Sequence, residues 1–132
     1  MDSLNPNIRG GNSPLKALAY GVLIKYGDYT PDVVAGDVAE LFLGLANEVL
    51  VDWNMHPYLA DADNVPFYVS VDDAREIPDI VMQNGLHSKY CQQQGSEKMP
   101  IANAAYFQYL NLMAYQTQTG GKNPPLKFKE RR

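Results

Sequence analysis

His87 and Cys91 have the residue types and the spacing of half a zinc site. They are four residues apart, so on a helix they would share one face. A zinc site needs two more ligands, and only His56 and scattered acidic residues remain, at no spacing that suits a metal. Cys91 is then more simply interpreted as a small buried apolar residue, and His87 as a partly exposed polar one. We therefore predict that the chain binds no metal.

The acidic segment 61–64, Asp-Ala-Asp-Asn, resembles the start of a calcium-binding loop. Such a loop requires an oxygen ligand at its fifth position, a glycine at its sixth and a glutamate at its twelfth. Those positions hold Val65, Pro66 and Asp72. Because the turn that shapes the loop is missing, we exclude calcium.

The remaining polar residues do not form a recognisable catalytic set. Asp72 and Asp73 could act as acid and base, but their place shortly before Pro78 fits favourable charge near a helix N-terminus. No Ser/His/Asp or Cys/His arrangement has local support, and neither Gly10–Gly11 nor Gly120–Gly121 belongs to a phosphate-binding loop. We predict that the protein is not an enzyme and has no cofactor.

The C-terminal segment 120–132, GGKNPPLKFKERR, differs from the rest of the chain. Residues 122–132 carry five basic side chains and one acidic, a net charge of +4, whereas the whole chain has −4, which leaves −8 for the rest. Leu126 and Phe128 alternate with lysines, a pattern typical of an extended segment that docks its apolar side. A disordered, solubilising end is the alternative. The acidic remainder is not expected to bind nucleic acid non-specifically.

Bulk composition predicts one globular domain in a reducing compartment. A chain of 132 residues is most simply one domain, and its single cysteine excludes an internal disulfide framework. The N-terminus lacks the apolar segment of a signal peptide, and no apolar run is long enough to span a membrane.

Helix start signals and apolar spacing predict four helices. Ser13 and Thr30, each followed by proline, are candidate N-caps of the first two. The expected helices span about residues 13–27, 30–54, 77–95 and 99–119. Gly36 and Gly44 in the second helix either let another helix approach closely or are merely tolerated. We expect a mostly α, four-helix bundle-like domain at 13–119, an N-terminal arm at 1–12 and an extended C-terminal tail at 120–132.

The segment 55–76 between the second and third helices is predicted to be a loop insertion with a short strand. Within it, Phe67, Val69 and Val71 alternate with Tyr68 and Ser70. A single short strand is not stable alone. The segment is therefore either a packed loop with an extended stretch, or an arm that pairs with or packs on another subunit.

The last two predicted helices have apolar residues on more than one face. The third has one stripe with Ile80, Val81 and Cys91, and an opposite stripe with Met82, Leu86 and Tyr90. The fourth has Ile101, Ala105 and Leu112 on one side and Tyr106, Leu110 and Met113 on the other. Helices that are apolar all round are buried all round. Either the last helix is the central one or subunits associate, and we predict association.

In the order of these elements, residues 13–132 resemble the head-to-tail adaptor (connector) proteins of tailed bacteriophages, especially the short-tailed type. The resemblance rests on a long second helix ending in Leu50–Asn54, a loop-and-strand insertion, and a third helix opened by Ile77–Asp79. A break at Gly95–Pro100, a last helix and a non-globular tail follow.

The resemblance implies a structural virion protein at the head-tail junction, made in the cytoplasm of the host bacterium. It would form a dodecameric homo-oligomeric ring beneath the portal and bridge the portal to tail tube, nozzle or fibre proteins. Viral DNA would pass through on ejection without specific binding, and no membrane would be involved.

The resemblance also assigns the singled-out residues to surfaces. The portal-docking tail would use Leu126, Lys127, Phe128, Lys129, Arg131 and Arg132. Contacts between subunits would use Met82, Leu86, Tyr90, Tyr106, Leu110 and Met113. The loop facing neighbours or tail components would use Phe67, Tyr68, Val69 and Val71.

The alternative hypothesis is a small helical regulatory protein that binds a partner protein or nucleic acid through its basic tail. It predicts a monomer or dimer, and nucleic-acid binding that is sensitive to salt and lost without the tail.

Overall fold

The computed structural model describes residues 13–26 and 36–119, which form four α-helices and one short 3-10 helix. The elements are α2 (Leu15–Tyr26), α3 (Gly36–Asn54), η2 (Pro57–Leu59), α4 (Asp79–Gln93) and α5 (Met99–Gln118). Within these ranges no strand forms. The predicted mostly helical, bundle-like domain is thus confirmed, whereas the predicted arms at 1–12 and 120–132 lie outside the described residues.

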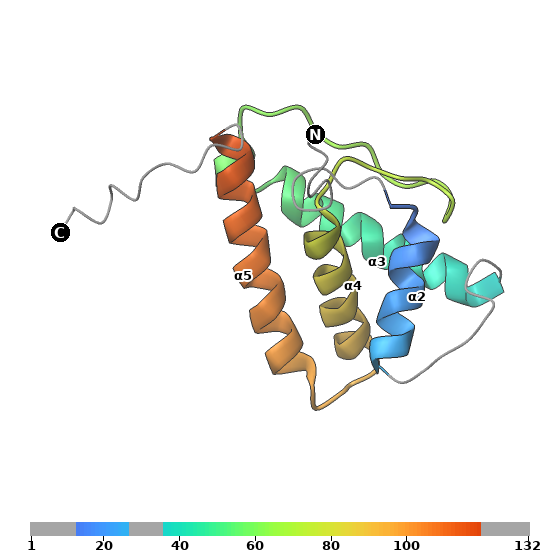
Figure 1. Ribbon diagram of the computed structural model, residues 1–132. Helices are drawn as coiled ribbons and strands as arrows, with labels where there is room; N and C mark the ends of the chain where they lie inside the picture. Colours follow the sequence, from blue (N-terminus) through green and yellow to red (C-terminus); the bar gives the residue numbers. More distant parts are fainter. Residues whose placement is uncertain (1–12, 27–35, 120–132) are drawn as a thin grey trace.

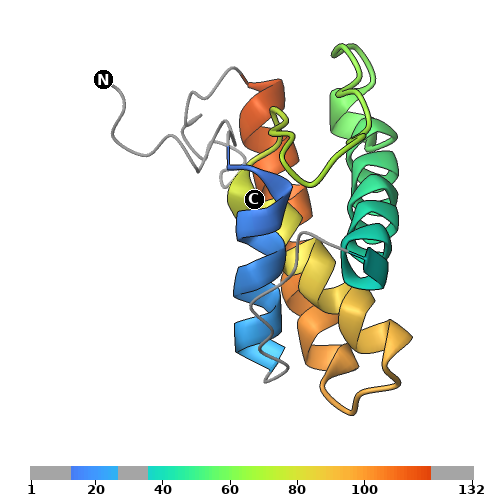
Figure 2. The same ribbon diagram turned by 90° about the vertical axis from the view of Figure 1, so that its right-hand side faces the viewer.

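Helix α4 lies at the centre of the fold. It packs against each of the other three α-helices. Figures 1 and 2 show α2 and α5 on opposite sides of α4, with α3 crossing behind this layer. The segment between α3 and α4 runs over one end of the bundle, from the side of α5 to the start of α2 (Figure 1).

The central position of α4 explains its two apolar stripes. Val81, from one stripe, and Met82 and Leu86, from the other, are all completely buried. Tyr90 retains 7% exposure and stacks on Phe42 of α3 with ring centroids 5.4 Å apart. Both stripes therefore belong to the core of a single chain, and the third helix has no surplus face for a second subunit.

Gly85 is the glycine at which helices approach closely. A Cβ atom built there would lie 2.7 Å from a methyl carbon of Val49 on α3 and 2.8 Å from the ring of Tyr106 on α5. At Gly36 and Gly44 the same atom would meet nothing within 4 Å. The close approach considered for those two glycines is thus absent from the described residues, and it occurs on α4 instead.

Glycines in the left-handed region mark two helix ends. Gly36, with φ of +64°, begins α3. This conformation interrupts a right-handed helix, so α3 is not continuous across Gly36. The predicted helix start near Thr30 lies outside the described residues. Gly95, with φ of +66°, follows α4, and the N–H of Ser96 donates to the carbonyl of Cys91 at 2.9 Å. This bond is typical of a glycine-terminated helix and confirms the predicted break at Gly95.

The start of α2 is capped by the loop rather than by its own serine. The N–H of Leu15 donates to the carbonyl of Asp73 at 3.0 Å, and that of Lys16 to the carbonyl of Val71 at 2.8 Å. Ser13, the predicted N-cap, instead donates its hydroxyl to the aspartate at the start of α4. The loop therefore takes up backbone donors that the first helical turn leaves unpaired.

Candidate interaction surfaces

Two asparagines of α3 hold the loop segment 65–68 in an extended conformation. The amide of Asn54 donates to the carbonyl of Val65 at 3.0 Å and accepts from the N–H of Val65 at 2.9 Å. Two helical turns earlier, Asn47 does the same with Tyr68, donating at 3.2 Å and accepting at 2.8 Å. Each asparagine thus takes the place of a neighbouring strand.

Arg75 holds the same segment from the other side. Its Nε donates to the carbonyl of Pro66 at 3.0 Å, and its Nη2 donates to the carbonyl of Phe67 at 2.9 Å. Its Nη1 donates to the carbonyl of Ala74 at 3.0 Å, and Nη2 also forms an ion pair with Asp73 at 3.3 Å. The guanidinium group is therefore occupied by the protein itself.

Asp73 closes the tip of the loop. One of its carboxylate oxygens accepts from the N–H groups of Val69 and Ser70 at 2.8 and 2.9 Å. These two backbone hydrogen bonds favour the charged form and hold the pKa of Asp73 below its usual value. The loop tip is thus a defined turn.

The structure changes the interpretation of the 67–71 pattern. Phe67 and Val69 are 51% and 80% exposed, whereas Tyr68 and Val71 are buried. The predicted strand with Phe67, Val69 and Val71 on one face is wrong, because no strand forms in the described residues and Val71 is buried while Phe67 and Val69 are exposed. Asn47 and Arg75 already bond backbone groups of Tyr68 and Phe67. The predicted packed loop with an extended stretch is confirmed. Phe67 and Val69, which we call the loop face, remain available for a partner.

A second set of exposed apolar side chains is distributed along α5. Ile101, Phe107 and Leu112 are 77%, 45% and 47% exposed, and we call them the α5 face. Nearby, Tyr58 of η2 contacts Tyr115 with ring centroids 5.7 Å apart. Apolar residues predicted on two sides of this helix therefore divide into a buried side and an exposed side.

The residues predicted to join subunits are on the buried side. The exposed fractions do not exceed 7% for any of Met82, Leu86, Tyr90, Tyr106, Leu110 and Met113. Side chains enclosed by their own chain cannot contact another one, so this assignment is wrong. The portal-docking residues Leu126, Lys127, Phe128, Lys129, Arg131 and Arg132 lie outside the described residues.

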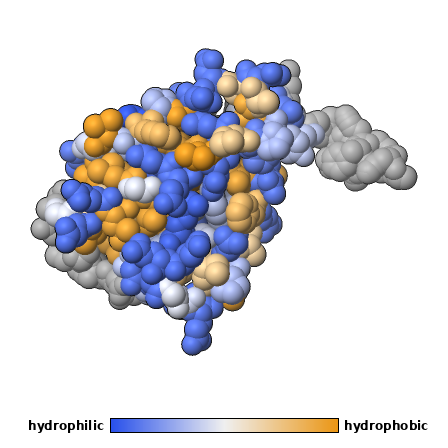
Figure 3. Space-filling view, turned by 180° about the vertical axis from the view of Figure 1, so that it is seen from behind, coloured by the Kyte–Doolittle hydropathy of each residue, from blue (hydrophilic) through white to orange (hydrophobic). Residues whose placement is uncertain are grey.

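The rear of the molecule, on the α3 side, carries both apolar and polar exposed side chains. Figure 3 shows apolar side chains gathered on the side away from the end of α5, with polar side chains between them. On α3 itself, Val51 is 41% exposed, Leu41 and Leu43 are half-buried, and Glu40 and Glu48 are exposed. The apolar side chains of this face are therefore gathered mainly away from the end of α5 (Figure 3).

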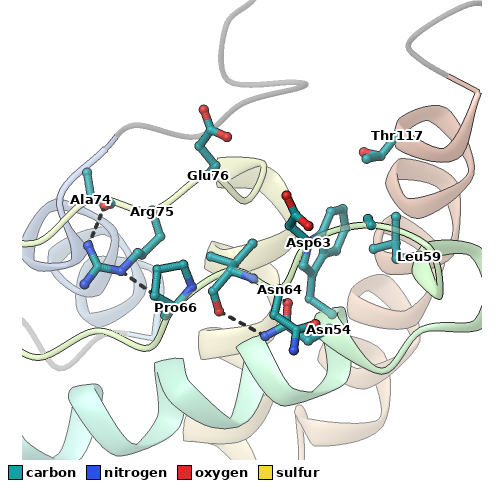
Figure 4. A pocket seen from close by; sticks show the side chains of 12 residues that line it. Asn54, Leu59, Asp63, Asn64, Pro66, Ala74, Arg75, Glu76 and Thr117 are labelled. Carbon is teal, nitrogen blue, oxygen red and sulfur yellow. Dashed lines mark hydrogen bonds between the residues drawn. The ribbon is translucent and has the colours of Figure 1, made fainter.

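An open cavity of about 630 Å³ lies between the loop and the C-terminal end of α5. Figure 4 shows Thr117 of α5 and Leu59 on one side, Ala74 and Arg75 on the other, and Asn54 below. Trp53 and Leu59 in its wall are each 5% exposed, so the wall is anchored in the core. Its volume is in the range of about 300–1,000 Å³ that is typical of binding pockets.

The charges of this cavity favour a basic ligand. Its charged lining residues are Asp63, Arg75 and Glu76. Asp63 and Glu76 are exposed, and Figure 4 shows the Glu76 carboxylate directed away from Arg75. Because Arg75 is already bonded to loop carbonyls and Asp73, the two acids provide the available charge.

A polar cluster joins α3, α4 and α5 at a separate place. The hydroxyl of Tyr106 donates to Asp52 at 2.6 Å, and the Nζ of Lys89 lies 3.3 Å from the same carboxylate oxygen. Burial and then the bond to Asp52 raise the pKa of Tyr106 well above its usual value. None of these three residues lines the cavity beside Trp53.

His87 and Cys91 do share a face of α4, with Nε2 and Sγ 3.7 Å apart. Burial lowers the pKa of His87 and raises that of Cys91, so both neutral forms are favoured. In the part of the chain that the structure describes, no three His, Cys, Asp or Glu residues are grouped as metal ligands. None of the helices described is long and apolar enough to cross a membrane.

Comparisons with known proteins find one short similarity. No family model matches the chain, and no solved structure matches it. Over 68 residues the chain is 37% identical to the DNA-directed RNA polymerase subunit beta' of Ehrlichia chaffeensis. The match covers 52% of this chain but 4% of that subunit, so it shows a similar segment and neither a family nor an activity.

Proposed function

We propose that the protein is a structural head-to-tail adaptor of a tailed bacteriophage, which forms a ring beneath the portal and bridges it to tail components. The observation that carries the proposal is the presence of two different exposed apolar faces on one small domain. A ring is built from head-to-tail contacts, in which each subunit uses two non-equivalent surfaces.

The positions of the elements that carry the two faces support such a contact. Helix α5, which carries the exposed residues Ile101, Phe107 and Leu112, lies on one side of α4 (Figure 1). The loop face lies toward α2, because Val71 and Asp73, just after it, accept hydrogen bonds from the start of that helix. Since α2 and α5 flank α4 on opposite sides, the α5 face of one copy could meet the loop face of the next.

The tail gives the proposal its second contact. In the proposed assembly the basic residues of 122–132, with Leu126 and Phe128, dock on the portal protein, while tail tube, nozzle or fibre proteins bind the ring below. The acidic remainder of the chain, with a net charge of −8, favours passage of DNA without tight binding.

Native mass spectrometry of the full-length chain, alone and mixed with portal rings of the phage that encodes it, tests the proposal. We expect one adaptor per portal subunit in the mixture, and closed rings in electron micrographs of the complex. Absence of a complex, with only monomers or dimers, would contradict it. Salt-sensitive retention on DNA would then favour the regulatory alternative.

A further inference from the structure

We propose that the cavity beside Trp53 is a binding site for the C-terminal segment of the same chain. In this arrangement Leu126 and Phe128 contact the apolar wall of the cavity, and the neighbouring lysines lie at its acidic edge.

Chain connectivity brings the segment within reach of the cavity. Thr117, near the end of α5, is one of the lining residues, and the segment follows three residues later. Phe128 follows Thr119 by nine positions, a distance that extended chain can span over about 30 Å. The segment can therefore enter the cavity of its own chain. Its effective concentration there is high, so the segment of a second copy would compete only at a higher protein concentration.

Charge and apolar character of the segment match the cavity. Asp63 and Glu76 are the available charges, and both are acidic, whereas the segment carries Lys127 and Lys129 on either side of Phe128. The neighbouring acids Asp61 and Asp72 are exposed as well.

The shape of the wall suits an extended peptide. Trp53 and Leu59, each 5% exposed, form the base of the cavity from α3 and η2, and Val65 and Pro66 line it along the loop. Two prolines just before Leu126 favour an extended conformation of the peptide. Aromatic-lined grooves commonly bind proline-containing segments in this way.

This inference is independent of the portal. If the proposed function also holds, the cavity would store the tail until the portal competes for it. The tests below use the chain alone. A negative result in them would not contradict ring assembly on the portal, and a failure to assemble on the portal would not contradict binding of the segment in the cavity.

Photo-crosslinking tests the position of the segment. The full chain carries p-benzoylphenylalanine in place of Phe128, and a mixture of isotopically light and heavy copies is irradiated. We expect crosslinks from position 128 to peptides containing Trp53, Leu59 or Thr117, with both parts from the same copy. Light-heavy pairs would show that a second copy is the occupant, and absence of crosslinks to the cavity would show that it is not the site. Either result overturns the proposal.

A matched control uses the same photoreactive residue in place of Phe107. That position lies ten residues before Thr117 on α5, about 15 Å along the helix, and belongs to the exposed α5 face. We expect no crosslinks from it to the cavity. Crosslinks there from both positions would mean that the reaction is non-specific and would remove the support.

Fluorescence tests the energetics, because Trp53 is the one tryptophan of the chain. Full-length L126S/F128S should differ from the wild type in Trp53 emission. A synthetic peptide of residues 122–132 should restore the wild-type spectrum with saturation. The peptide carrying both serines should bind at least about tenfold more weakly. Identical spectra for wild type and variant, with no response to peptide, would overturn the proposal.

Acid-to-amide variants test the charge. E76Q in the L126S/F128S background should weaken peptide binding by about two- to fivefold and reduce its salt dependence. E40Q, on the exposed outer side of α3, is the matched control and should change neither. Equal effects of both variants would show that only net charge attracts the peptide, contrary to a specific site.

Discussion

Asn54 and Val65 exchange two hydrogen bonds, at 3.0 and 2.9 Å, between the end of α3 and the extended segment after η2. The side-chain amide presents an N–H donor beside a carbonyl acceptor, as a peptide group does, so it satisfies both backbone groups of one residue at once. With the equivalent pair of Asn47 and Tyr68, it fixes a loop that has no neighbouring strand. This clamp forms one wall of the cavity and sets the direction in which Phe67 and Val69 emerge.

Asn54→Asp should therefore destabilise the protein. A carboxylate keeps the acceptor for the N–H of Val65 but places a charge against the Val65 carbonyl. We expect a loss of about 1–3 kcal/mol in the free energy of unfolding, measured by urea denaturation. Hydrogen exchange at the amide of Val65 should become faster.

The control for this change is Asn64→Asp. The same substitution at this exposed loop residue should alter the free energy of unfolding by no more than about 0.5 kcal/mol. A similar loss at both positions would mean that added negative charge, rather than the clamp, is responsible.

Local signals were sufficient to predict the helices. Proline and glycine at helix ends placed α4 between Pro78 and Gly95 and the start of α5 near Met99, as the structure confirms. These signals depend on backbone conformation within a few residues, which the sequence contains. The predicted helix start near Thr30 lies outside the described residues, whereas the described helix α3 begins at Gly36, whose positive φ the local signals did not predict.

The exposed apolar surfaces were predicted less well than the helices, because the exposure of an apolar helix face depends on which other element packs against it. A helical wheel separates Met82 from Val81 but does not show that α4 is enclosed on both sides. The clamp was missed for a related reason. Asn47 and Asn54 have the spacing of one helix face, but their partners lie on a distant loop and leave no local signal. The cavity likewise arises from three separated segments.

Two aspartate substitutions distinguish the core from the proposed subunit surface. Leu86→Asp places a charge at a fully buried position, so we expect loss of the helical circular dichroism signal. Ile101→Asp, at a position that is 77% exposed, should leave the signal and the unfolding midpoint nearly unchanged while abolishing ring assembly on the portal. A folded, assembly-competent Ile101→Asp protein would exclude the α5 face from the ring contact.

Glycine-to-alanine substitutions should have opposite effects at two helical positions. Gly85→Ala adds a methyl group 2.7 Å from Val49 and 2.8 Å from Tyr106, so we expect a loss of about 1–3 kcal/mol in the free energy of unfolding. Gly44→Ala adds it in open space on α3, where alanine favours the helix by about 0.5–1 kcal/mol. Thermal unfolding of both variants measures the difference, and stabilisation by Gly85→Ala would show that α3 and α5 do not approach α4 as described.

Tyr68 and Tyr106 should respond differently to loss of the hydroxyl group. Both rings are buried, but the hydroxyl of Tyr106 donates to Asp52, whereas that of Tyr68 has no hydrogen-bond partner among the described residues. Tyr106→Phe should cost about 1–2 kcal/mol in the free energy of unfolding at neutral pH, and Tyr68→Phe should be neutral or slightly stabilising. Urea denaturation of the two variants checks the contrast, and a cost at Tyr68 as large as at Tyr106 would indicate a partner for its hydroxyl.

Tyr68 also predicts how the free energy of unfolding depends on pH in the alkaline range. Burial raises the pKa of Tyr68 from 10.0 to about 12, so above pH 10 the unfolded chain releases a proton that the folded one retains. The resulting stabilisation is complete below pH 10 and decreases as the pH rises toward about 12. Tyr68→Phe should therefore flatten the decrease in the free energy of unfolding between pH 10 and about 12 relative to the wild type. An unchanged slope in urea denaturation over this interval would mean that Tyr68 ionises as readily in the folded protein as in the unfolded chain.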